Sequence, residues 1–154
     1  MFLRHFDFSE QLYICIKKMK ISRGLRNNNP LNIRKNGTKW KGLADDQNDK
    51  SFFTFTSPAW GYRAAFITLR NYRLIHDCRT LRSWIYRWAP PVENDTKTYL
   101  HFVERNSGIG AEENPDTDSA EVMCSIVAAM SHMENGIPAR MEDVRAGWEL
   151  SVKN

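Results

Sequence analysis

The sequence has little of what marks membrane proteins and disulfide-stabilised domains. No apolar run approaches the roughly 18 residues that a transmembrane helix needs, so we expect no membrane span. The three cysteines, Cys15, Cys78 and Cys124, are odd in number and show no paired spacing. This pattern favours reduced thiols over a disulfide scaffold and predicts a protein made in the cytoplasm.

Motifs for metals and nucleotides are also missing. The histidines lie far from one another and at no metal-ligand spacing from a cysteine or an acid; they are His5, His76, His101 and His132. No glycine-rich loop of the phosphate-binding kind occurs. We therefore expect neither a metal nor a cofactor.

The N-terminal stretch does not have the pattern of a signal peptide. Its apolar run, LYICI at residues 12–16, is too short, and no small-residue cleavage site follows. Met19 is an alternative start. We divide the chain into an N-terminal extension, residues 1–18, and one domain, residues 19–154, because 154 residues with 42% hydrophobic content are about one domain long.

Charge is unevenly distributed along the chain. Residues 17–41 contain nine Lys or Arg and no acid, whereas residues 104–121 contain six acids and one Arg. A basic patch attracts any polyanion, including nucleic acid and the anionic bacterial wall, and it can equally be a solvated face with no partner. We do not favour nucleic acid, because the basic run is interleaved with Asn and Pro and carries no recognised reading element.

Capping residues and apolar periodicity predict a mainly helical α+β domain. The expected helices begin at Pro58, Leu81, about Thr96, Asp118 and Pro138. Residues 51–56, SFFTFT, are aromatic and β-branched and predict a short strand, paired with residues 31–35 or 39–43. The expected fold is therefore one domain in which a small β-hairpin within residues 31–55 packs beside about five helices.

An asparagine-rich stretch, residues 23–40, is predicted to be a sharply shaped loop. It places four asparagines around Pro30 and repeats the turn chemistry at Asn36-Gly37. Such a loop presents amide donors and acceptors together, which suits a neutral ligand rich in hydroxyl and amide groups, such as a glycan or peptide. The alternative is a solvated turn without a ligand.

This stretch and the segments after it resemble the core of the lysozyme-like peptidoglycan hydrolases. The nearest patterns are those of N-acetylglucosaminidases and of small phage and prophage proteins that carry RGxRNNNPxNI. The matching residues are Arg23, Gly24, Asn27, Asn28, Asn29, Pro30, Asn32, Ile33, Trp40, Gly42, Phe52, Phe55, Ser57, Pro58, Gly61, Arg63, Ala64, Trp88, Ala89, Pro90, Pro91, Glu93, Asn94, Asp95, Thr96 and Tyr99.

The resemblance implies a lysozyme-like fold and a glycosidase or lytic transglycosylase that cleaves the glycan backbone of peptidoglycan, acting at the cell wall or from a phage particle. It equally allows a non-catalytic virion-associated or wall-binding relative. Glycan strands are the expected partner, with other virion or secretion proteins as further partners. The side chains expected to line one substrate cleft are Asn28, Asn29, Asn32, Trp88, Asn94 and Tyr99.

Glu134 is the first candidate for the catalytic acid. Glycosidic cleavage needs a carboxyl that stays protonated near neutral pH, and contact with apolar side chains favours the protonated form. Ile126, Met130 and Glu134 lie on one line of a helix, so the acid ends an apolar stripe. The segment also looks like the catalytic helix of lysozyme-like enzymes, in a permuted order. The alternative is a frayed, exposed acid in the last helical turn.

Glu93 and Asp95 are the second candidates, because they follow a rigid Pro pair and could project into a cleft beside Trp88 and Tyr99. The alternative is that Asp95 caps the next helix and Glu93 interacts with its dipole. Glu10 ranks third, since it lies at a family-like distance ahead of the asparagine-rich stretch, in surroundings unlike a catalytic helix.

Overall fold

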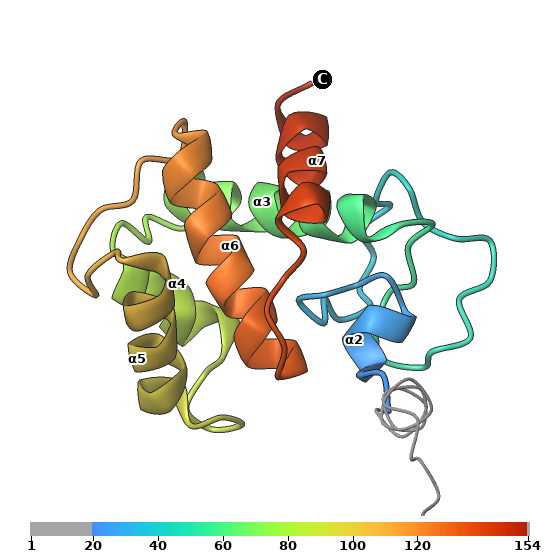
Figure 1. The fold of residues 1–154 in the computed structure, drawn as a ribbon, viewed down its shortest axis with the longest axis horizontal. Coiled ribbons are helices and arrows are strands. Elements are labelled where there is room, and N and C mark those ends of the chain that lie inside the picture. Colours follow the sequence, from blue (N-terminus) through green and yellow to red (C-terminus); the bar gives the residue numbers. More distant parts are fainter. Residues whose placement is uncertain (1–19, 154) are drawn as a thin grey trace, which may run out of the picture.

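A computed structural model describes residues 20–153. The predicted boundary of the N-terminal extension and Glu10 lie outside these residues. Six helices are present in the described part of the chain (Figure 1), which confirms a mainly helical protein. They are α2 (Arg23–Arg26), α3 (Pro58–Leu74), α4 (Leu81–Trp88), α5 (Thr96–Ser107), α6 (Ala120–Asn135) and α7 (Met141–Val152).

Helix α6 is the centre of the arrangement and contacts four other helices. It packs on α5 and α7, and it also contacts α2 and α3. In Figure 1, α4 and α5 lie on one side of α6, and α2 with the loop that follows it lies on the other. The most extensive helix pair is α3 with α7. Asn135, the last residue of α6, is bonded to Ser22 and Pro30, so segments far apart in the sequence meet at the C-terminal end of α6.

The core explains why α6 is central. Along this helix Met123, Ile126, Val127 and Met130 are fully buried. Apolar side chains at these spacings form a stripe that packs against neighbouring helices. Large side chains from the rest of the chain complete the core; they include Leu31, Phe55, Phe66, Leu69, Leu81, Trp84 and Ile85.

Local capping chemistry fixes most helix ends as predicted. Thr80 and Ser83 form a reciprocal capping box at the start of α4. The Asp95 side chain accepts a hydrogen bond from Thr98 N and begins α5. Gly108 and Gly136 end α5 and α6 in left-handed conformations, at φ 75° and 73°.

Three boundaries differ from the prediction. The asparagine-rich stretch begins with a four-residue helix, α2, because the Ser22 side chain caps Leu25 N. Helix α6 is capped by Ser119 and not by Asp118. Helix α7 starts at Met141, three residues after Pro138. Ser22 and Ser119 supply the caps of α2 and α6, whereas α7 begins without a side-chain cap. The spacing of residue types did not distinguish these starts.

The predicted β-hairpin is not formed as regular strands. Within residues 20–153 the pairing consists of two isolated antiparallel bridges, Arg34 with Phe52 and Leu43 with Phe55. Asparagine and glutamine side chains take up backbone groups that a second strand would otherwise bind. Asn29 Nδ2 donates to Phe53 O, and Gln47 Nε2 donates to Thr54 O. The segment is thus an irregular layer held by side-chain amides.

Within the described part of the chain, every helix is too short or too polar to cross a lipid bilayer.

Candidate functional site

The buried amide of Asn29 organises the loop after α2. Its Nδ2 donates to Ile33 O at 3.0 Å and to Phe53 O at 2.9 Å, while its Oδ1 accepts from Ile33 N at 2.9 Å. Asn29 is fully buried, so these bonds satisfy groups that water cannot reach. Its amide therefore shapes the loop and is not available to a ligand.

Two further asparagines also serve the loop itself. Asn28, at φ 50°, donates through Nδ2 to Phe55 O at 3.0 Å. Asn27 donates to Asp49 Oδ2 at 2.8 Å. Asp49 also accepts two hydrogen bonds from Arg23, at 2.6 and 2.7 Å, and these bonds hold the pKa of its carboxyl far below its usual range.

The loop is fixed to the end of α6 through Asn135. Its Nδ2 donates to Pro30 O at 2.7 Å, and its Oδ1 accepts from Ser22 Oγ at 2.7 Å. Gly24 permits this close approach, because a Cβ there would lie 2.9 Å from oxygens of Asn135, Asn29 and Asn32. The residue after Glu134 is therefore bonded to the loop that carries Asn32.

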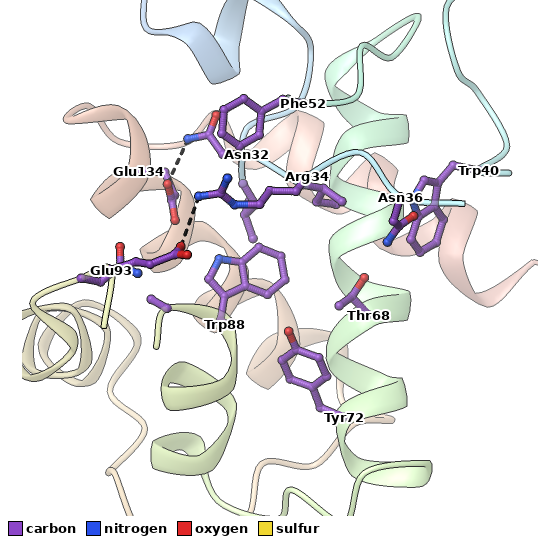
Figure 2. A pocket seen from close by; sticks show the side chains of 14 residues that line it. Asn32, Arg34, Asn36, Trp40, Phe52, Thr68, Tyr72, Trp88, Glu93 and Glu134 are labelled. Atoms are coloured by element: carbon purple, nitrogen blue, oxygen red, sulfur yellow. Dashed lines mark hydrogen bonds and ion pairs between the residues drawn. The ribbon is translucent and has the colours of Figure 1, made fainter. Parts of the chain in front are cut away.

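A groove of about 340 Å³ lies between this loop and the end of α4 (Figure 2). Charged, amide and aromatic side chains line it together, which is the composition of a site for a polar ligand. The lining residues are Leu31, Asn32, Ile33, Arg34, Asn36, Trp40, Phe52, Thr68, Tyr72, Trp88, Ala89, Glu93, Asn94 and Glu134.

Glu134 is the half-buried acid of the groove. Its Oε1 accepts from Tyr99 Oη at 3.0 Å and its Oε2 accepts from Asn32 Nδ2 at 2.9 Å. Figure 2 shows the Asn32 contact. Burial, together with the charge of Glu134, raises the pKa of Tyr99 well above its usual range, so its hydroxyl stays a donor. Two side chains thus orient this carboxyl.

Glu93 lies in the same groove but is exposed. Its Oε2 accepts from an Arg34 guanidinium nitrogen at 3.3 Å, and the Arg34 and Glu93 side chains are 68% and 60% exposed. The contact joins the asparagine-rich loop to the loop between α4 and α5 (Figure 2). Neighbouring Asn94 is also exposed and donates to Pro90 O at 3.3 Å.

The structure brings some of the predicted site residues together and separates others. Asn32, Trp88, Glu93, Asn94 and Glu134 line the groove. Tyr99 is buried and does not line the groove, but its hydroxyl donates a hydrogen bond to Glu134.

Three predicted site residues stabilise the fold and do not line the groove. Asn28 and Asn29 bind backbone carbonyls of the loop layer and do not line the groove. Asp95 is the N-cap of α5, bonded to Thr98, and this hydrogen bonding lowers the pKa of Asp95. The capping alternative for Asp95 is therefore the arrangement found.

The groove also contains side chains that the sequence analysis did not propose as binding residues. They are Leu31, Ile33, Arg34, Asn36, Trp40, Phe52, Thr68, Tyr72 and Ala89. Trp40 and Phe52 belong to the motif residues that carry the family resemblance, but no pattern marked them as binding residues. Alternation along an extended segment does not find Arg34 and Asn36, because Asn32 has a left-handed φ of 50° and the buried Ile33 also lines the groove. Thr68 and Tyr72, on α3, had no local signal.

The fold and the groove define a small, mainly helical protein with one oriented acid in a polar and aromatic cleft. The chain matches no protein-family model. It is 36% identical over 132 residues to Protein P5 of Pseudoalteromonas phage PM2, which covers 83% of this chain and 81% of that protein. The chain therefore belongs to the family of this phage protein.

Proposed function

We propose that the protein is a lysozyme-like glycosidase or lytic transglycosylase that cleaves the glycan backbone of peptidoglycan, with Glu134 as the general acid. The observation that carries this proposal is the half-buried Glu134 carboxyl, oriented by Tyr99 and Asn32 and open to the groove. A general acid must be held within hydrogen-bond reach of the atom it protonates. The phage relative adds a setting in which wall cleavage is useful.

The chemistry assigned to Glu134 is proton transfer to the oxygen of the scissile glycosidic bond. The carbon–oxygen bond then breaks with the development of an oxocarbenium-like sugar, and the leaving sugar takes the proton as its hydroxyl. Water completes the reaction in a hydrolase, whereas a hydroxyl of the same sugar completes it in a transglycosylase. In either case the carboxylate left on Glu134 accepts a proton, from the attacking water in a hydrolase or from the attacking sugar hydroxyl in a transglycosylase.

The other walls of the groove supply binding for a sugar chain. Trp88 and Tyr72 present aromatic surface, and their rings lie 6.4 Å apart in an edge-to-face arrangement. Asn36 and Asn94 supply exposed amide groups of the kind that bind hydroxyl and acetamido substituents, whereas the amide of Asn32 is bonded to Glu134. Aromatic surface with a few convergent polar groups is the usual composition of a ligand site.

The test is digestion of purified peptidoglycan followed by mass analysis of the soluble products. The proposal expects fragments cut in the glycan backbone, with reducing ends from hydrolysis or anhydro ends from transglycosylation. Glu134→Gln, which keeps the shape and loses the proton, should release them at least about a hundredfold more slowly. Release of peptides with intact glycan strands would contradict the proposal.

A second candidate is a non-catalytic wall-binding protein of the phage particle. The exposed Arg34–Glu93 contact across the groove favours it, because it occupies part of the space that a substrate needs. No release at any pH between about 4 and 8, where carboxylates and histidines titrate, together with co-sedimentation with purified peptidoglycan, would select this candidate.

A further inference from the structure

We propose that Arg34 binds a carboxylate of the substrate, so that the groove selects glycans bearing carboxylates over neutral glycans. The inference rests on the proposed function for the glycan itself and adds the class of glycan that is preferred. In the free protein, Glu93 occupies the place of that substrate carboxylate.

Arg34 is held in the groove by an aromatic ring as well as by Glu93. Its guanidinium carbon lies 5.5 Å from the centroid of the Phe52 ring, and that of Arg23 lies 4.6 Å from the same centroid. Arg23 is itself fixed by its two hydrogen bonds to Asp49. A cation beside an aromatic ring is attracted to it. Arg34 therefore keeps its position when Glu93 moves away.

The two arginines differ in how fully their charge is matched. Arg23 binds Asp49 through two nitrogens, and the Asp49 side chain is only 9% exposed. Arg34 has one contact with Glu93, at 3.3 Å, between exposed side chains. Exposed ion pairs are weak, whereas guanidinium binds a carboxylate best through two parallel hydrogen bonds. Exchange of Glu93 for a substrate carboxylate thus costs little and can add a second bond.

The position of Arg34 matches a charged substituent on a sugar chain. Arg34 lines the groove with Trp88 and Glu134, and Figure 2 shows its side chain extending toward Glu93. In wall glycan, a lactyl ether supplies a carboxylate where it carries no peptide, and where a peptide is joined to it by an amide the peptide supplies its own carboxylates. Either source has the chemistry that Arg34 requires.

The experiment compares calorimetric binding of three glycans of equal length. They are neutral chitotetraose, a peptide-free muramyl tetrasaccharide, and the same tetrasaccharide with peptide stems. Binding is measured in the full chain and again in the Glu134→Gln background, where proposed turnover is removed. Tighter binding of the peptide-free form over chitotetraose identifies the lactyl carboxylate. Selectivity that appears only with the stems identifies their carboxylates.

Arg34→Gln should weaken binding of the preferred anionic glycan by about tenfold, which corresponds to about 1.4 kcal/mol, and leave chitotetraose unchanged. Glu93→Gln should tighten anionic binding, because the competing carboxylate is lost. Lys39→Gln is the matched control: it removes an exposed cation outside the groove lining and should leave the selectivity unchanged.

Equal losses for neutral and anionic glycans in Arg34→Gln would overturn the inference, as would equal affinity of the unaltered protein for all three glycans. Failure of the proposed function is seen separately. Selective binding without backbone cleavage would support the role of Arg34 and contradict Glu134 as the general acid. Cleavage of the glycan backbone without selectivity would support Glu134 as the acid and contradict the role of Arg34.

Discussion

Two carboxylates face the same groove and are held in contrasting ways. Glu134, at the end of α6, receives hydrogen bonds from Tyr99 on α5 and from Asn32 on the loop after α2. Glu93, on the loop between α4 and α5, has one 3.3 Å contact with Arg34 and is 60% exposed. The first carboxyl is fixed by its surroundings, and the second is free to exchange its partner.

The structure beneath each carboxylate explains the contrast. Asn135, next to Glu134, is bonded to Pro30 and Ser22, so the end of α6 and the loop form one rigid unit. Val92, next to Glu93, is almost fully exposed. A proton donor in catalysis must be fixed relative to its substrate, whereas a contact that a ligand replaces must be weak. The two regions suit these two tasks.

Removing the buried amide of Asn29 should have the largest effect on this arrangement. Asn29→Ala leaves Ile33 N and Phe53 O without their partners in a buried place, while Ile33 O keeps its bond from Phe53 N. An unsatisfied buried polar group costs about 1–3 kcal/mol, so we expect a loss of about 3 kcal/mol or more in the free energy of unfolding, measured by urea denaturation. Exposed Asn94→Ala is the control and should change it by less than about 0.5 kcal/mol.

Tyr99→Phe should loosen the oriented carboxyl and leave the exposed one untouched. It removes the hydroxyl that binds Glu134 Oε1 at 3.0 Å. We expect the rate constant kcat for glycan cleavage to fall by about tenfold, equal to about 1.4 kcal/mol, with KM little changed. The measurement is steady-state cleavage of a soluble glycan fragment.

Tyr62→Phe is the matched control for that change. Its buried hydroxyl pairs with Ser131 Oγ at 2.9 Å, and Tyr62 does not line the groove. It should cost stability as Tyr99→Phe does, yet preserve kcat. Equal falls in kcat for both variants would mean that Tyr99 acts only through the stability of the core.

Asp49→Asn should have a smaller effect that depends on pH. The pKa of Asp49 is lowered in the folded protein, first by its bond to Arg23, so the unfolded chain binds more protons in acid. Its contribution to stability is thus present above about pH 4 and lost as pH falls below that. The difference in unfolding free energy between the unaltered protein and Asp49→Asn should be largest near pH 7 and shrink toward pH 2. A constant difference across this range would contradict the assignment.

What could be predicted from the sequence was local. Thr80, Asp95 and Gly136 lie within a few residues of the helix ends that they determine, and the helices they bound were found. The stripe ending at Glu134 was likewise visible along one helix. The hairpin was predicted from strand propensity, but side chains such as Asn29 and Gln47 replaced strand pairing.

The site itself depends on contacts that no local pattern contains. Tyr99 and Glu134 are 35 residues apart, and Asn32 and Glu134 are 102 apart. The cluster of asparagines indicated an amide-rich surface but not which amides point inward. Asn29 is buried beneath the loop while Asn32, three residues later, faces the groove. The composition of the loop predicted that it is rich in amide groups. Which amides are buried and which line the groove depends on tertiary packing.

The most direct test of the central proposal is the rate of glycan cleavage by Glu134→Gln and Glu93→Gln, measured side by side on purified peptidoglycan. A general acid contributes about a hundred- to ten-thousand-fold in rate, so Glu134→Gln should lose that much while remaining folded. Glu93→Gln should change the rate by less than about fivefold, because an exposed ion pair is worth at most about 1 kcal/mol. Loss of cleavage in Glu93→Gln with activity retained in Glu134→Gln would contradict the account and make the loop carboxylate the acid.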